Sequence, residues 1–215
     1  MMNNYENKII KLKNKSLSLL IENIPVTIMP CDLSDETIHL LTDWREKYSD
    51  FFASKFIVSE NRTKQWLEKN YIYKNDQILF LLIINGKKIG HIGITNYDKN
   101  KNCSEIDNVL RGDRENFPGI MKVVLMKILK IGFDELFLDK FILKVFHDNK
   151  KAISLYKTCG FILIDSIPLE KILTSDGWYL SPTTKNNVFN EKYHDIMQIT
   201  KEQFKNTRKI NTCNG

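Results

Sequence analysis

Residues 145–161 read VFHDNKKAISLYKTCGF, and this stretch decides the fold. Its apolar beginning is typical of a strand, and Asn149 is a residue type that favours the N-cap of a helix. One face of that helix carries side chains at i, i+3, i+4 and i+7, namely Ala152, Leu155, Tyr156 and Cys159. Gly160 favours the end of the helix, and Phe161 begins a further strand. The stretch therefore predicts a strand–helix–strand unit.

Upstream of this unit, the pattern predicts a sheet with a buried helix. Residues 78–84 are a continuous apolar run, short enough for a strand covered on both faces. Asn85-Gly86 follows, and this dipeptide is a strong hairpin signal. We expect the return strand over 87–97 and a third long strand over 103–110. The segment 119–133 is apolar almost all round, which indicates a helix buried among other elements.

Two earlier helices and a weaker C-terminal pattern complete the expected organisation. One helix should begin after Asp32 or Ser34, and a second after Ser59. Their inward side chains are expected to be Ile38, Leu41, Trp44 or Arg45, Tyr48, Trp66 and Leu67. We expect a long loop over 175–190 and an edge strand over 193–199. The domains should be an extension at 1–23, one folded domain at 24–199 and a polar tail at 200–215.

The composition limits the class of protein. The chain has 215 residues and a formal net charge of +6, which suits an acidic small partner. No basic stripe interleaved with aromatic residues points to nucleic acid. No apolar run reaches the length of a membrane span. The cysteines are far apart, which argues against a zinc site or disulfides and favours a cytoplasmic protein; they are Cys31, Cys103, Cys159 and Cys213.

The pattern Asn-x-x-Ala-x-x-x-Tyr-x-x-x-Gly-Phe directly after a strand resembles the C-terminal signature of the GNAT superfamily, the acyl-CoA-dependent N-acyltransferases. The order of expected elements over residues 24–167 is also similar to that family. The resemblance implies an α/β GNAT fold: a mixed central sheet with helices on both faces, splayed at a wedge that holds CoA. Acetyl-CoA or another acyl-CoA would be the co-substrate, with no metal.

The junction between the third strand and the buried helix is the expected phosphate site. Amides at a helix N-terminus, with the positive end of its dipole, can hold a pyrophosphate. The family's loop reads Gln/Arg-x-x-Gly-x-Gly/Ala, and the matching frame is 116–121, with Asn116 first, Gly119 kept and Met121 last. Met121 adds bulk where the pyrophosphate should pass, unless its side chain turns inward, and Pro118 is expected at the first helical position. The resemblance implies these cofactor-binding residues: Val109, Leu110, Arg111, Phe117, Pro118, Gly119, Ile120, Met121, Asn149, Lys151 and Tyr156.

The implied reaction is direct attack of a neutral amine on the thioester, which needs a base and an acid. Tyr156 matches the family's tyrosine that protonates the CoA sulfur; a core tyrosine is the alternative. Asp107 and Glu105 share one face of the third strand, and we prefer Asp107 as the base because it lies nearer the thioester. His91 and His147 are the other candidates, although a strand histidine is more often structural.

The acceptor is expected to bind through the first two helices and the loop between them. The candidate residues are Trp44, Arg45, Phe51, His91 and Asn108, although core packing is the alternative for the aromatic ones. Trp-Arg near the end of the first helix resembles the branch with ribosomal-protein N-terminal and amino-sugar-nucleotide acetyltransferases. An amino sugar or sugar nucleotide is therefore the favoured acceptor. The alternatives are a peptide or protein amine and a non-catalytic CoA-binding domain, and a homodimer is possible in each case.

Overall fold

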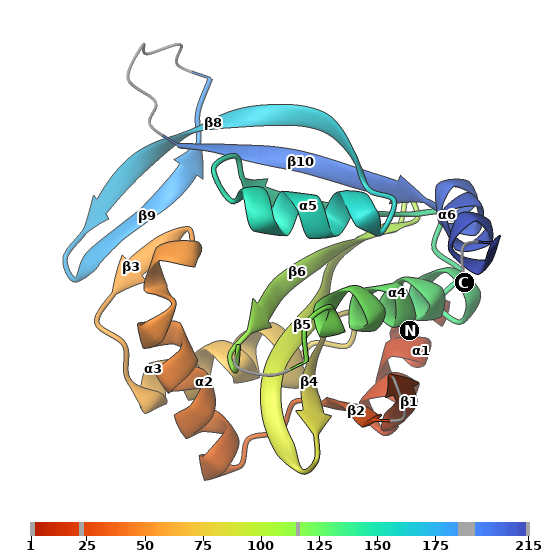
Figure 1. The fold of residues 1–215 in the computed structure, drawn as a ribbon. Coiled ribbons are helices and arrows are strands. Elements are labelled where there is room, and N and C mark those ends of the chain that lie inside the picture. Colours follow the sequence, from red (N-terminus) through yellow and green to blue (C-terminus); the bar gives the residue numbers. More distant parts are fainter. Residues whose placement is uncertain (1–2, 22–23, 115–116, 185–191, 214–215) are drawn as a thin grey trace.

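The computed structural model describes residues 3–21, 24–114, 117–184 and 192–213. Figure 1 shows the arrangement of the elements. In chain order they are α1 (Asn4–Lys13), β1 (Leu17–Ile21), β2 (Ile24–Pro30), α2 (Asp35–Lys47), η1 (Ser49–Phe51), β3 (Ser54–Phe56), α3 (Glu60–Leu67), η2 (Glu68–Ile72), β4 (Ile78–Ile84), β5 (Lys87–Asp98), β6 (Cys103–Arg111), α4 (Ile120–Asp134), β7 (Lys140–Phe146), α5 (Lys150–Thr158), β8 (Ile162–Thr174), β9 (Gly177–Pro182), β10 (Lys192–Thr200) and α6 (Lys201–Cys213).

The strands form one mixed sheet in the order β1-β2-β4-β5-β6-β7-β10-β8-β9-β3. Among the described strands, β6 and β7 are the parallel pair, and the other neighbours are antiparallel. The parallel pairing runs only from Cys103↔Lys140 to Glu105↔Ile142. Beyond these residues β6 and β7 separate, which is the splayed sheet that the sequence predicts.

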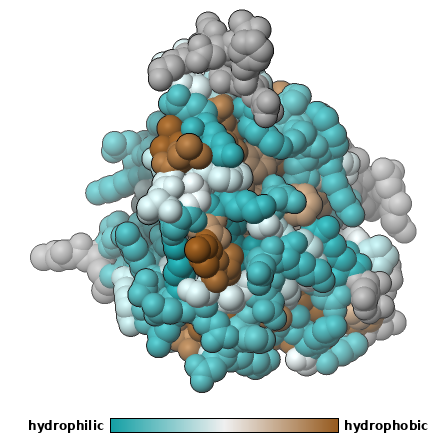
Figure 2. All heavy atoms as spheres, turned by 90° about the vertical axis from the view of Figure 1, so that its left-hand side faces the viewer, coloured by the Kyte–Doolittle hydropathy of each residue, from teal (hydrophilic) through white to brown (hydrophobic). Residues whose placement is uncertain are grey.

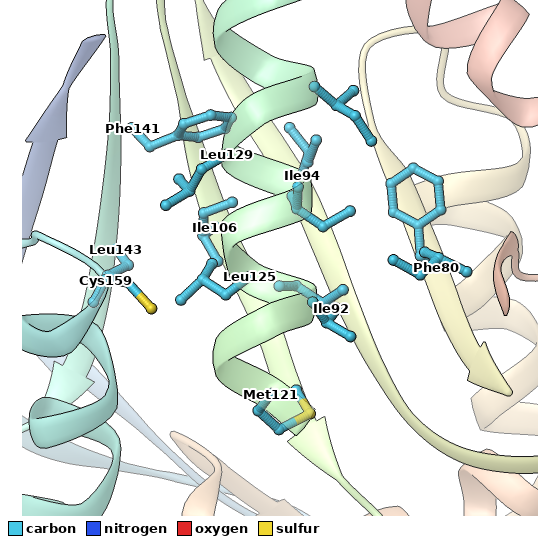
Figure 3. Packing of buried hydrophobic residues seen from close by; sticks show 14 of the residues in the cluster. Phe80, Ile92, Ile94, Ile106, Met121, Leu125, Leu129, Phe141, Leu143 and Cys159 are labelled. Atoms are coloured by element: carbon cyan, nitrogen blue, oxygen red, sulfur yellow. The ribbon is translucent and has the colours of Figure 1, made fainter. Parts of the chain in front are cut away.

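Helices cover both faces of the sheet, because β4 is apolar on both sides. Phe80 and Leu82 belong to the core cluster formed with α1, α4, α5 and α6, whereas Leu79 and Leu81 pack with α2, α3 and η2. Figure 3 shows the first cluster: Leu125 and Leu129 of α4 lie against Ile92, Ile94 and Ile106 of the sheet. All of these side chains are almost fully buried.

Local sequence signals correctly predicted the central elements. Ser34 and Ser59 cap α2 and α3, each accepting a hydrogen bond from the backbone amide three residues later. The hairpin at Asn85-Gly86 has positive φ at both residues (49° and 76°), as its turn type requires. Strand β4 has the expected bounds, and α5 lies between Asn149 and Gly160 as predicted.

The two ends of the chain differ from the expectation. Helix α1 was not foreseen: Asn3 and Glu6 form a capping box, and Tyr5, Ile9 and Leu12 bury one face of the helix. Residues 201–213 form helix α6 instead of a polar tail, and Phe204 of this helix packs into the core. The expected loop at 175–190 was wrong in its described part. Residues 177–182 form β9 after a two-residue turn at Ser175-Asp176, and β9 pairs with β8.

Strand β10 is an inner strand, so the expectation of an edge strand at 193–199 was wrong. It pairs with β7 on one side and β8 on the other. Asp195, Met197 and Ile199 alternate along one buried face, which explains the position physically. The strand forms the upper layer in Figure 1 beside β8 and places His194 near the wedge.

Candidate active site

A cavity of about 630 Å³ opens where β6 and β7 separate. It extends from the start of α4 and the start of α5 across the sheet to the loop after α2. Its lining includes most of the residues that the sequence placed at the cofactor, namely Val109, Leu110, Arg111, Gly119, Met121, Asn149, Lys151 and Tyr156. Phe117, Pro118 and Ile120 do not line it.

A bulge in β6 shapes the floor of this cavity. His91 and Gly93 of β5 oppose Leu110 and Asp107, so β6 has one extra residue between these two pairs. Asn108 lies in this bulge with a φ of 49°. Its backbone carbonyl accepts a hydrogen bond from Nδ1 of His91 at 2.6 Å, and its side-chain amide donates to the Tyr71 hydroxyl at 2.6 Å. The bulge is thus fixed from two sides.

The N-terminus of α4 borders the cavity. Gly119 is the N-cap residue, and its φ of 80° prevents the helix from including Pro118, so the expectation of proline at the first helical position was wrong. The helix begins at Ile120, so the positive end of its dipole lies at the cavity. Asn116, the first residue of the expected phosphate loop, lies outside the described residues.

Met121 packs mainly into the core, although it also lines the cavity. Its side chain is only 8% exposed and packs into the core below Leu125 (Figure 3). The alternative that the methionine turns inward is therefore the one observed. Four cationic side chains border the cavity near this helix and the end of β6: Arg111, Arg114, Lys122 and Lys151. Together with the helix N-terminus they fit the charge of an acidic cofactor.

Tyr156 reaches the cavity from α5 and is otherwise buried. Among the described residues nothing hydrogen bonds its hydroxyl. Burial raises its pKa, and the nearby Asp107 carboxylate raises it further, so the hydroxyl stays protonated at neutral pH. Tyr156 can therefore donate a proton to a group bound in the wedge. Asn149 caps the same helix, since its side chain accepts a hydrogen bond from the Ala152 amide at 3.1 Å.

The two predicted acids have different environments. Glu105 is buried and accepts hydrogen bonds from Asn96 at 2.9 Å and from the Lys144 ammonium at 3.0 Å. Asp107 has no ion pair among the described residues, and its side chain is accessible from the cavity while protein atoms surround it. This partial desolvation, together with the negative charge of Glu105, raises the pKa of Asp107. A carboxylate with a raised pKa is the better base of the two.

The two histidines have lesser roles in this geometry. His91 is 4% exposed, and burial lowers its pKa to about 4, so it is neutral with its Nδ1 proton held by Asn108. His147 is exposed, pairs with the Asp195 carboxylate at 3.0 Å and does not line the cavity. Cys159 is fully buried in the core, as expected for a packing residue.

A second cavity of about 280 Å³ adjoins the first on the side of α2, α3 and β3. Asp107, Asn108, Phe52 and Ala53 line both cavities, so the two lie next to each other. Of the expected acceptor residues, Arg45, His91 and Asn108 line this second cavity and Phe51 lines the first. Trp44 lines neither, because its ring packs against Gly112.

Several lining residues were not foreseen from the sequence. They are Lys144 and Phe146 on β7, His194 on β10, and Phe56 and Arg62 near β3 and α3. Alternation along β7 could have indicated Lys144, but His194 required the position of β10 in the sheet. Among the described residues, no group of three His, Cys, Asp or Glu side chains is arranged to hold a metal ion. In the same part of the chain, no helix combines the length and the apolar character needed to cross a membrane.

A mixed sheet that opens between two parallel strands beside a helix N-terminus defines the GNAT class of fold. The chain belongs to the acetyltransferase (GNAT) domain family, whose family model matches residues 26–162. The predicted fold, family and enzyme class, an acyl-CoA-dependent N-acyltransferase, are thereby confirmed. No curated protein sequence matches the chain.

Similar solved structures support the same fold. Spermidine N-acetyltransferase from Vibrio cholerae, in complex with CoA and spermine, has a TM-score of 0.65 and 17% identity, covering 83% of this chain and 97% of that one. Its dodecameric structure has a TM-score of 0.63 and 16% identity, covering 83% and 95%. An uncharacterized protein from Bacillus halodurans has a TM-score of 0.65 and 17% identity, covering 91% and 95%.

Proposed function

We propose that this chain transfers an acetyl or other short acyl group from acyl-CoA to the primary amine of a small molecule. The observation that carries the proposal is one cavity in which Tyr156 and Asp107 face the same space between β6 and β7. The basic side chains at one end suit the phosphates of CoA, and the backbone of β6 after its bulge offers pairing to an extended arm.

The proposed roles follow from the two protonation states. Asp107, as the ionised base, takes a proton from the attacking amine, directly or through water. The amine nitrogen forms a bond to the thioester carbon, and the carbon–sulfur bond breaks. Tyr156 gives its hydroxyl proton to the departing sulfur. Asp107 returns its proton to solvent, Tyr156 recovers one, and no covalent enzyme intermediate is needed.

Lys144 and Asn96 have a supporting role in this scheme, because they hold the Glu105 carboxylate in place. The fixed negative charge of Glu105 lies near Asp107 and favours its protonated form. Asp107 is thus a stronger acceptor of the amine proton than an ordinary exposed carboxylate.

The acceptor class is the finer part of the proposal. The spermidine N-acetyltransferases that resemble this chain act on a polyamine, as their name says. Their sequences are 15–17% identical to this chain, which supports the shared fold alone. The amino-sugar or sugar-nucleotide acceptor expected from the sequence stays a prediction. The small volume of this cavity, about 280 Å³, favours a small molecule over the alternative of a protein amine, which would need an open groove.

Release of free thiol from acetyl-CoA tests the proposal. The purified chain should release CoA in the presence of small primary amines and should not do so without an amine. A chain that binds acetyl-CoA but releases no thiol with any amine would favour the non-catalytic CoA-binding alternative. A preference for peptide N-termini over small amines would favour the protein-amine alternative.

A further inference from the structure

The charged side chains that line the smaller cavity indicate which charges its ligand should carry. Three ionised side chains line it: Arg45, Arg62 and Asp107. Arg62 is neutralised, since its guanidinium pairs with the Asp176 carboxylate. Asp107 has no cationic partner at ion-pair distance among the described residues. The cavity therefore has one carboxylate and one further cation, Arg45, to match with a ligand.

The Arg45 guanidinium is held by a serine and two aromatic rings rather than by a carboxylate. Its Nη2 donates to the backbone oxygen of Ser54 at 2.6 Å and to the Ser54 hydroxyl at 3.0 Å. Its guanidinium lies 3.9 Å from the centre of the Phe52 ring and 4.8 Å from that of Phe56. These contacts fix the plane of the group at the cavity wall and engage one edge of the fork, that of Nη2.

The other edge of the fork has no partner within the described part of the chain. Nη1 of Arg45 has almost no accessible surface and makes no hydrogen bond there, and no carboxylate pairs with the guanidinium, so the charge of this cavity-lining residue is not compensated within the described part of the chain. A buried cation without an anion is costly, and a planar fork is suited to a bidentate contact with a carboxylate or phosphate. Burial lowers the pKa of Arg45 to about 10, so the group remains charged at neutral pH.

From this arrangement we infer that the acceptor is an amine that also bears an anionic group, which Arg45 binds while the amine lies at Asp107. The inference rests on the proposed function and deepens it. A carboxylate, as in an amino acid, and a phosphate, as in an amino-sugar phosphate, share this chemistry. A polyamine has only positive charges, and Arg45 repels it. The acceptor thus differs in charge from the polyamines named for the similar structures.

Matched amines that differ only in the anionic group test the inference. Thiol release from acetyl-CoA would be measured with tyrosine against tyramine, with glucosamine 6-phosphate against glucosamine, and with spermidine. In the unaltered chain, at least one amine with an anionic group should have a kcat/KM about 10-fold or more above that of its partner without the group. The pair that shows the difference identifies a carboxylate or a phosphate as the source.

Variants then assign the preference to the residue. Arg45→Gln should lower the ratio of kcat/KM for the amine with the anionic group to kcat/KM for its partner without that group by about 10-fold or more. Arg45→Lys, which keeps the charge without the fork, should fall between the two. Lys47→Gln is the matched control, because it removes the same charge from an exposed site on the same helix, outside both cavities. Thermal melts check that each variant folds.

Equal kcat/KM values of the unaltered chain for amines with and without the anionic group would overturn the inference. The thiol release itself would still support the proposed function. An equal loss on both members of a pair in Arg45→Gln would also overturn it. If no amine in the panel caused thiol release, the proposed function and this inference would fail together. The two failures are therefore distinguishable.

Discussion

The side-chain amide of Asn108 donates a hydrogen bond to the Tyr71 hydroxyl at 2.6 Å. Tyr71 is buried in η2, the segment that continues α3, whereas Asn108 lies in the bulge of β6 between the two cavities. Lys13 of α1 donates to the Tyr71 carbonyl, which ties the N-terminal helix to the same segment. The position of the bulge therefore depends on contacts far along the chain.

Replacing Tyr71 by phenylalanine should destabilise the fold. The change removes one of two hydrogen-bond acceptors of the Asn108 side-chain amide, which also donates to Oδ2 of Asp107 at 3.0 Å. We expect a loss of about 1 kcal/mol in the free energy of unfolding, or about 2–4 °C in Tm, measured by thermal denaturation. Tyr73→Phe is the control, since the same hydroxyl is removed from an exposed side chain. Equal Tm values for both variants would contradict the role of Tyr71.

Replacing Asp107 by asparagine should remove the base. We expect kcat to fall roughly 10²-fold or more, with the affinity for acetyl-CoA almost unchanged. Because burial raises the pKa of Asp107, the acidic limb of the unaltered enzyme's pH–rate profile should lie above the usual carboxyl range, with activity present above that pKa and lost below it. The limb should be absent from Asp107→Asn.

Asp165→Asn is a matched control for this variant. Asp165 also accepts a hydrogen bond from the amide of the next residue, at 2.8 Å against 2.7 Å for Asp107, but lies on β8 outside both cavities. Similar kinetics of the two variants would show that the Asp107 carboxyl does not act on the amine.

Replacing Tyr156 by phenylalanine should remove the proton donor while the ring keeps its packing. We expect kcat to fall roughly 10²-fold and the KM for acetyl-CoA to stay within a few-fold of the unaltered value. Steady-state kinetics of thiol release provide the measurement, with the exposed Tyr179→Phe as the control. An unchanged kcat would leave Tyr156 as a packing residue of α5 and refute its role as the acid.

His91 should make the stability of the fold depend on pH. Burial lowers its pKa to about 4 from an ordinary value near 6.5, so the unfolded chain binds a proton between these values and the folded chain does not. The contribution of His91 to stability is therefore complete above about pH 6.5 and falls by roughly 3 kcal/mol as the pH drops to 4.

Urea denaturation at several pH values would measure this effect. His91→Gln should flatten the dependence between pH 4 and 6.5, although it lowers the stability at pH 7 by weakening the hydrogen bond to the Asn108 carbonyl. A variant with the same pH dependence as the unaltered chain would show that another group titrates in that range.

Local signals predicted the elements that hold the cofactor side of the site. The cap at Asn149, the periodic face of α5 and the stop at Gly160 are all encoded within one stretch, and they place Tyr156 at the wedge. The apolar run of β4 and the Asn85-Gly86 turn are equally local. Such signals need no knowledge of distant contacts, which is why they correctly predicted these bounds.

The acceptor side depends on contacts that no local pattern contains. Strand β10 is mostly polar on one face, and only its pairing with β7 and β8 brings His194 to the cavity. The fork of Arg45 is fixed by Ser54, and Arg62 is neutralised by Asp176, more than one hundred residues away in the chain. Strand β9 was missed because it is short, begins with a glycine and ends with a proline, and is defined by its pairing with β8 and β3. Figure 2 shows this side of the molecule, where hydrophobic residues form only small separate patches.

Titration of acetyl-CoA into the protein by calorimetry tests the central claim, the lodging of the thioester cofactor between β6 and β7, most directly. The account predicts one site per chain with a dissociation constant in about the micromolar range. It also predicts that Ala152→Trp, which fills the cavity from α5, weakens binding by about 10-fold or more, whereas Ser154→Trp on the exposed face of the same helix does not. No heat of binding in the unaltered chain, or equal affinity in the two tryptophan variants, would contradict it.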